Sequence, residues 1–140
     1  MISCTRKIEF DAAHRVMNHE SKCKYLHGHR YVLEATFAAD GLDNLGRVID
    51  FGVIKERLGN WIDEYWDHNT ILCEQDKDLG VVIEKQLSQK IFYLPTNPTA
   101  ENLADYLLRI VCESLFPESG VKCIRIRLYE TPNCYADACS

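Results

Sequence analysis

The chain has 140 residues, of which 46% are hydrophobic and 26% charged, and its formal net charge is -5. This length fits one domain that buries a core without disulfide staples. The acidic balance excludes a general electrostatic attraction to nucleic acid or anionic membranes, and no run approaches the ~18 apolar residues of a membrane helix. We therefore expect a single domain over residues 1–140 and a small-molecule partner.

The cellular compartment follows from the N-terminus and the cysteines. Residues 1–7 enter an alternating pattern without the continuous apolar core of a secretion signal, which favours a cytoplasmic protein. The seven cysteines form no pair of C-x-x-C motifs, and their odd number predicts free thiols. We expect no disulfide framework.

Two strands are predicted at the start of the chain. Residues 2–13 alternate loosely between apolar and polar side chains, and residues 30–39 are rich in strand formers and end in turn residues. The polar residues 18–24 between them predict a loop. These segments are typical of an antiparallel pair.

Two amphipathic helices are predicted in the middle of the chain. Asp50 can cap the first, whose apolar residues from Phe51 to Tyr65 keep to one stripe, which we interpret as core. The motif Asn97–Pro98–Thr99 favours the start of the second, which ends near Phe116. The long segment at about 70–97 has only weak patterns, and we interpret it as a surface excursion.

The last part of the chain predicts two more strands. Residues 121–129 alternate most regularly of all, and a short strand is expected over 134–138. The order strand, strand, helix, helix, strand, strand predicts an α+β fold with a four-stranded antiparallel sheet and both helices on one face. Its open edges would have to be blunted or paired between subunits.

Three histidines suggest a metal site. His27 and His29 are separated by a glycine, so on a strand both rings point to the same side. His14 ends an apolar strand and could complete a site of three imidazoles with an open position, for which zinc is the natural metal. A structural zinc that uses His19 and Cys23 is the alternative.

Other polar residues near these segments could carry proton chemistry. Cys23 lies between Lys22 and Lys24, which would favour its thiolate, although most cysteines are only small buried residues. Asp67 and His68 follow the first predicted helix, where they form either a cap or an acid–base pair.

Glu130 ends the most regular strand and could accept two parallel N–H donors from a guanidine-like ring edge. The alternative is an exposed glutamate at a turn.

Taken together, these motifs resemble the 6-pyruvoyltetrahydropterin synthase superfamily, and most closely its bacterial branch, the 6-carboxytetrahydropterin synthases of queuosine biosynthesis. The resemblance covers most of the chain. The matching motifs are Phe10–Arg15, Cys23-x-x-x-His27-Gly28-His29, Val48–Phe51, Asp67–His68, Asn97–Leu103 and Glu130–Thr131.

The resemblance implies a fold, a cofactor and site residues. The fold would be the tunnelling fold, with trimers that stack into hexamers and active sites between subunits. A zinc ion would be bound by His14, His27 and His29. Protons would be transferred by Cys23, Asp67 and His68, and the pterin pocket would be lined by Glu130, Glu101 and Thr99.

The implied reaction converts 7,8-dihydroneopterin triphosphate to 6-carboxy-5,6,7,8-tetrahydropterin and releases triphosphate and acetaldehyde. The three residues between Cys23 and His27 resemble the queuosine branch, whereas the biopterin branch has a longer interval. The alternatives are a 6-pyruvoyltetrahydropterin synthase and a pterin-binding member without turnover. Two departures from the family pattern, Asn69 in place of a second histidine and the long segment at 70–97, favour the pterin-binding member without turnover.

Lys22, Lys24, Arg15 and Arg30 are the candidate cations for the triphosphate.

Overall fold

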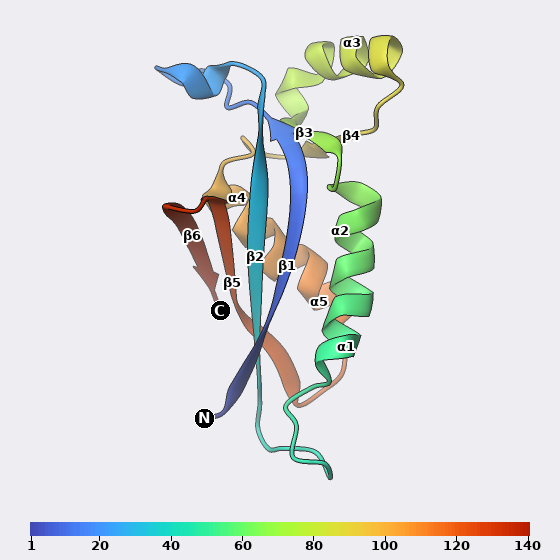
Figure 1. Cartoon of the computed structure of the whole chain (residues 1–140), viewed down its shortest axis with the longest axis vertical. Helices are drawn as coiled ribbons and strands as arrows, with labels where there is room; N and C mark the ends of the chain where they lie inside the picture. The colour runs from blue at the N-terminus through green and yellow to red at the C-terminus, as the bar shows by residue number, and fades with distance from the viewer.

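The computed structural model describes residues 1–140 and shows one mixed sheet with helices packed against it (Figure 1). The sheet has six strands in the order β4-β3-β1-β2-β5-β6. Neighbouring strands are antiparallel except that β3 is parallel to both β1 and β4. The strands are β1 (Ser3–His14), β2 (His27–Ala39), β3 (Asn69–Cys73), β4 (Ile91–Leu94), β5 (Val121–Thr131) and β6 (Cys134–Cys139).

Three helical segments accompany the sheet. The first comprises α1 (Phe51–Ile54) and α2 (Asn60–Tyr65), joined by a wider helical turn, Lys55–Gly59. The second is α3 (Lys77–Leu87). The third comprises α4 (Ala100–Tyr106) and α5 (Glu113–Leu115), joined by the wider turn Leu107–Cys112. The first and third segments confirm the two predicted amphipathic helices.

Side-chain caps explain where these helices begin. Asp50 Oδ1 accepts a hydrogen bond from the N–H of Gly52 at 2.7 Å, and Thr99 Oγ1 accepts one from the N–H of Asn102 at 3.2 Å. Each cap satisfies one of the donors that a helix leaves open at its N-terminus. Asp50 therefore has the capping role that the sequence predicted.

The core lies between the first and third helices and one face of the sheet. It is a cluster of 24 buried residues, and each large side chain that is fully buried there contributes about 1.5–3 kcal/mol. Of the predicted stripe, Ile54, Leu58 and Ile62 belong to this cluster and Trp61 packs against it, whereas Phe51 and Tyr65 at the two ends are exposed. The fully buried members of the cluster include Phe10, Tyr31, Leu33, Ile54, Leu58, Ile62, Leu103, Leu107, Ile126 and Leu128.

The register of β1 and β2 separates two sets of side chains. Phe10 lies opposite Tyr31, and both are fully buried against the helices. Asp11 lies opposite Arg30. Because successive side chains of a strand point to opposite faces, this charged pair lies on the other, more exposed face of the sheet.

The predicted four-stranded antiparallel sheet is wrong in its details. Residues 69–94 contain β3, α3 and β4, which add two parallel strands to the sheet and a third helix. Strands of four and five residues are too short to show a clear period. In addition, β3 pairs with the distant strand β1, and β4 pairs with β3 across the whole of α3. Gly80 lets α3 approach β4, since a Cβ there would lie 2.0 Å from Tyr93 Oη.

The remaining expectations concern membranes and disulfides. None of the helices combines the length and the apolar character that a membrane crossing requires. All seven cysteines are free, which confirms the prediction from their number and spacing.

Candidate metal centre and active site

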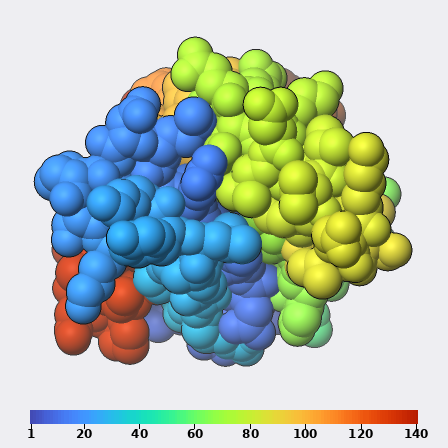
Figure 2. All heavy atoms as spheres, turned by 90° about the horizontal axis from the view of Figure 1, so that it is seen from above, coloured from blue at the N-terminus to red at the C-terminus, as the bar shows by residue number.

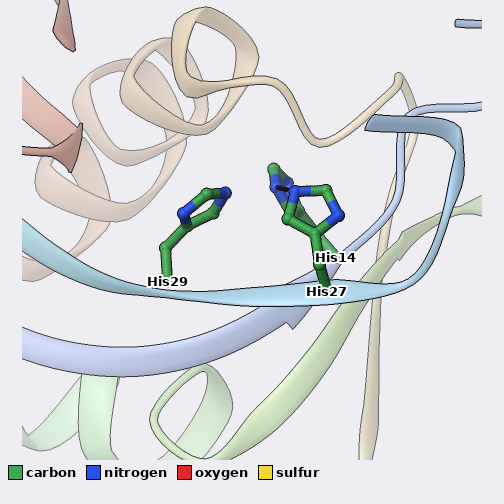
Figure 3. Close-up of side chains that lie close together, drawn as sticks. All are labelled: His14, His27 and His29. Atoms are coloured by element: carbon green, nitrogen blue, oxygen red, sulfur yellow. Dashed lines mark hydrogen bonds between the residues drawn. The ribbon is translucent and has the colours of Figure 1, made fainter. Parts of the chain in front are cut away.

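Three imidazoles gather on the helix-covered face of the sheet, at the ends of β1 and β2 (Figure 3). The register places His14 opposite His27, and His29 is two residues further along β2. Their ring centroids are 4.7–5.1 Å apart, and one ring nitrogen of each lies within 4.8 Å of the others. The structure thus brings together the three residues predicted as metal ligands.

Backbone carbonyls orient two of these rings. His14 Nδ1 lies 2.7 Å from the carbonyl oxygen of Pro98, and His27 Nδ1 lies 2.6 Å from that of Tyr25. A carbonyl only accepts, so each Nδ1 must carry the proton and each Nε2 must present a lone pair. The two Nε2 atoms lie 3.1 Å apart (Figure 3).

These nitrogens fit a metal ion. Zinc bonds of 2.0–2.1 Å in a tetrahedral site separate two nitrogens by about 3.3 Å. His29 Nε2 is buried and has no hydrogen-bond partner, which is costly unless an unseen group satisfies it. The donor set can therefore hold a metal ion without a large rearrangement.

Burial keeps His14 and His29 in the form that binds metals. It lowers the pKa of His14 to about 4, while the Pro98 carbonyl opposes this change and the two neighbouring histidines add to it. Burial also lowers the pKa of His29, against the opposing charge of Glu130. Both rings are consequently neutral near pH 7, as metal ligation by imidazole requires.

The carbonyl that holds His14 belongs to a loop clamped to the end of β1. Asn97 Oδ1 accepts from the N–H of Met17 at 3.0 Å, and Asn97 Nδ2 donates to the Met17 carbonyl at 3.1 Å. This clamp sets the distance between Pro98 and the ring of His14. The sequence indicated only a helix start here, because a backbone carbonyl leaves no signal in residue type.

Cys23 lies in a short 3₁₀ turn, Lys22–Lys24, and is half-buried. Its carbonyl accepts from the N–H of Val16 at 2.8 Å, which holds the loop near the end of β1. Neither Cys23 nor His19 belongs to the cluster of ligand atoms formed by the three histidines. The ring nitrogen Nδ1 of His19 instead accepts from the N–H of Ser21.

Asp67 and His68 form a close pair, with His68 Nδ1 3.0 Å from Asp67 Oδ2, which is an ion pair when His68 is protonated. The bond to Asp67 raises the pKa of His68. Partial burial works to raise the pKa of Asp67, but hydrogen bonds from the Asp11 N–H and from His68 outweigh it, and this pKa lies below its usual range.

This pair and the three histidines lie on opposite faces of the sheet. The side chains of Asp67 and His68 cluster with the carboxylate of Asp11. The Asp11 carboxylate accepts a hydrogen bond of 2.9 Å from Arg30 on the exposed face of the sheet. The structure therefore does not bring the predicted acid–base pair together with the predicted metal ligands within one chain.

Glu130 lies on the helix-covered face beside the triad. Its Oε1 is 3.3 Å from His29 Nε2, although without the angle of a hydrogen bond. Glu130 and Glu101 line a hollow of about 430 Å³ together with residues of β6. Thr99 does not line this hollow, because its hydroxyl caps α4.

The candidate cations differ in their surroundings. Arg15 forms a bidentate ion pair with Asp76, which is 4% exposed, and Arg30 pairs with Glu9 and Asp11 on the exposed face. Lys22 and Lys24 flank Cys23 in its 3₁₀ turn, and neither of them forms an ion pair with a carboxylate. Figure 2 shows the loop of residues 15–26 beside the segment that carries α3.

The departure at Asn69 has a local explanation. Its side-chain amide donates to the carbonyl of Tyr65 at 3.0 Å and so caps the C-terminus of α2. Sequence reasoning missed this cap, as it missed the partner of Arg15, because both contacts depend on the parallel strand β3.

Comparison with known proteins agrees with this geometry. The model of the family described as 6-pyruvoyl tetrahydropterin synthase matches residues 3–139. The chain is 51% identical over 137 residues to a protein of Rickettsia bellii named 6-carboxy-5,6,7,8-tetrahydropterin synthase, covering 98% of this chain and 99% of that one. It is 33% identical to a protein of the same name from Aquifex aeolicus, covering 95% of this chain and 94% of that one.

Solved structures show the same fold. An uncharacterized protein of Wolinella succinogenes matches with a TM-score of 0.82 at 21% identity, covering 99% of this chain and 98% of that one. The 6-pyruvoyl tetrahydropterin synthase of Caenorhabditis elegans matches with a TM-score of 0.70 at 23% identity, covering 99% and 95%. The α+β tunnelling fold is thereby confirmed, and so is the expectation of an enzyme, since the sequence relatives are synthases. From its motifs, its fold and these matches, the chain belongs to the 6-pyruvoyl tetrahydropterin synthase family.

Proposed function

We propose that this chain is a zinc-dependent lyase of queuosine biosynthesis that converts 7,8-dihydroneopterin triphosphate to 6-carboxy-5,6,7,8-tetrahydropterin, with release of triphosphate and acetaldehyde. The observation that carries the proposal is the juxtaposition of the three-histidine cluster with Glu130, 3.3 Å from His29. A metal site and a carboxylate for a pterin ring are thus adjacent. The near full-length match to proteins of this name supports the substrate and the product.

The three imidazoles would hold the zinc ion through their ring nitrogens. A bound zinc ion would polarise oxygens of the substrate side chain so that neighbouring C–H protons become removable. The protein contributes the orientation of the ligands, because Pro98 and Tyr25 fix the rings of His14 and His27 before any ion arrives. This preorganisation supports a permanent site.

Cys23 is the proposed group that moves protons on the zinc side. It stands outside the ligand cluster but on the loop that begins directly after His14. A thiol that is not committed to the metal can exchange protons with the substrate.

Asp67 and His68 would act in the site of a neighbouring subunit. Within one chain they face away from the triad, across the sheet. An active site between subunits, in a trimer or hexamer, would place the pair of one chain against Cys23 and the zinc site of another. The contact with Asp67 would then hold the His68 ring for proton exchange.

Recognition of the two ends of the substrate would be divided between two groups. The Glu130 carboxylate can accept two N–H donors from the aminopyrimidinone edge of the pterin, with Glu101 in the same hollow. Lys22 and Lys24 are the cations best suited to the triphosphate, because Arg15 and Arg30 already have carboxylate partners. Thr99 would contribute by fixing the start of α4 beside the hollow.

The carboxy product is preferred over the pyruvoyl product for two reasons. Three residues separate Cys23 from His27, as in the queuosine branch, and relatives that are 51% and 33% identical are named 6-carboxy-5,6,7,8-tetrahydropterin synthase. The 6-pyruvoyl alternative keeps all three carbons of the side chain in the product and releases no acetaldehyde.

The test is incubation of the zinc-loaded protein with 7,8-dihydroneopterin triphosphate and mass analysis of the products. We expect 6-carboxytetrahydropterin and acetaldehyde from the wild type. Cys23→Ala should abolish turnover while zinc stays bound, whereas Cys139→Ala, at an exposed cysteine of β6, should behave as wild type.

Other results would select a rival reading. A pyruvoyl product would reassign the chain to the other branch, and pterin binding without release of triphosphate would indicate a member without turnover. Sulfur among the zinc ligands by X-ray absorption would favour the structural site with His19 and Cys23.

A further inference from the structure

His68 has an unusual backbone conformation. Its φ is +58°, in the left-handed region that few residues other than glycine adopt. Such a conformation persists only where surrounding contacts determine it, and it is concentrated at functional sites. The contacts that hold the backbone of His68 therefore also set the direction of its imidazole.

Two hydrogen bonds hold this backbone. The N–H of His68 donates to the carbonyl of Asp11 at 2.6 Å. The carbonyl of His68 accepts from Gln89 Nε2 at 3.0 Å, and Gln89 Oε1 in turn accepts from the hydroxyl of Thr70 at 2.6 Å. Because Gln89 uses both ends of its amide, its donor is aimed at His68 in a fixed direction.

The fold explains why a side chain is needed at this point. The parallel ladder between β3 and β4 begins at Thr70 and Ile91, so the carbonyl of His68 lies before its first pair of residues. Helix α3 ends at Leu87, and the φ of +54° at the next residue, Ser88, turns the chain back toward β3 and delivers Gln89 there. The amide of Gln89 takes the place of one more ladder bond.

We propose that Gln89 is a positioning residue for His68. By fixing the left-handed backbone, it keeps His68 Nδ1 at 3.0 Å from Asp67 Oδ2 and keeps the ring directed into the hollow that Asp11, Arg30 and His68 line. The role rests on the proposed function, in which His68 moves protons. It also gives the segment between β3 and β4 a purpose, since that segment supplies Gln89.

The kinetic test compares three variants of the zinc-loaded protein with 7,8-dihydroneopterin triphosphate as substrate. Gln89→Ala should lower kcat by about 10- to 100-fold with KM little changed, because the ring is misplaced while binding groups stay. Thr70→Val keeps a strand-forming residue in β3 but releases Gln89 Oε1, so kcat should fall in the same direction. Gln86→Ala, on an exposed residue of α3, is the matched control and should leave kcat unchanged.

A second readout does not need turnover. Proton NMR of the histidine rings, with His68 assigned through His68→Gln, follows its titration beside Asp67, Asp11 and Arg30. In Gln89→Ala and Thr70→Val the midpoint should move down toward the ordinary value for histidine, because the ring is no longer held against Asp67.

The outcomes separate the two proposals. A wild-type protein with no turnover would overturn the proposed function, and the NMR comparison would still decide the role of Gln89. If kcat and the midpoint of His68 stay at wild-type values in both variants, or if both variants lose only thermal stability, Gln89 does not position His68.

Discussion

The Nε2 atoms of His14 and His27 lie 3.1 Å apart, and each ring is oriented by a carbonyl bound to its Nδ1. Two lone pairs directed at one point repel each other unless a cation lies between them. The pair is thus arranged for a metal by backbone contacts alone. Those contacts come from the loop before α4 and the turn before β2, so the site depends on tertiary structure.

Loss of one imidazole should empty the metal site. His29→Ala removes a buried ligand, and we expect zinc affinity to fall by more than the about 10- to 100-fold that loss of an outer hydrogen-bond partner costs. Metal content after gel filtration and competition with a chelator measure this change. His19→Ala is the control, and zinc loss there instead would contradict the assignment.

Mixing two inactive variants should restore activity if the active site lies between subunits. Cys23→Ala and His68→Ala each damage one half of the site. After mixed refolding, roughly a quarter of the sites in a random oligomer combine two intact halves, and that fraction of wild-type activity should return. A mixture that stays inactive, from variants shown to exchange subunits, would place both halves in one chain.

The ion pair between Arg15 and Asp76 should show unequal costs when each partner is removed. Arg15→Ala leaves a carboxylate that is 4% exposed without a partner and should destabilise the fold by about 3 kcal/mol or more. Asp76→Asn leaves a guanidinium that is 34% exposed and partly hydrated, so the loss should be about 2 kcal/mol or less.

Denaturant unfolding of both variants measures this difference. Arg109→Ala, which breaks an exposed pair with Asp105, should cost less than about 1 kcal/mol. Equal losses for Arg15→Ala and Asp76→Asn would show that burial of the carboxylate does not set the cost.

The pH dependence of His68 should follow its bond to Asp67. The raised pKa means that the bond favours charged His68. Its contribution is therefore present below the ordinary histidine pKa and is lost as pH rises through the raised one. Asp67→Asn should move the NMR midpoint, and the limb of the pH–rate profile that His68 sets, to lower pH. Asp63→Asn, at an exposed residue of α2, should leave both where they are, and a shift there would point to general electrostatics.

Much of the fold follows from local patterns. The stripe from Phe51 to Tyr65 and the alternation over residues 121–129 predicted a helix and a strand that the structure contains, because one buried face imposes its period on the sequence. The segment of β3 and β4 was misread. Its strands are short, and both pairings are parallel, β3 with β1 and β4 with β3, so no tight turn in the sequence marks either of them.

The candidate site, too, could be predicted from the sequence only in part. The sequence by itself predicted that three histidines gather as candidate metal ligands, because the spacing of His27 and His29 on a strand places two rings on one side and His14 ends the strand that pairs with them. Only the tertiary structure decided that Asp67 and His68 face away from these histidines. It also decided that Pro98 contacts His14, Asp76 pairs with Arg15 and Gln89 contacts His68. Those relationships join residues far apart in the chain through strand register and backbone carbonyls, which leave no pattern in the order of the amino acids.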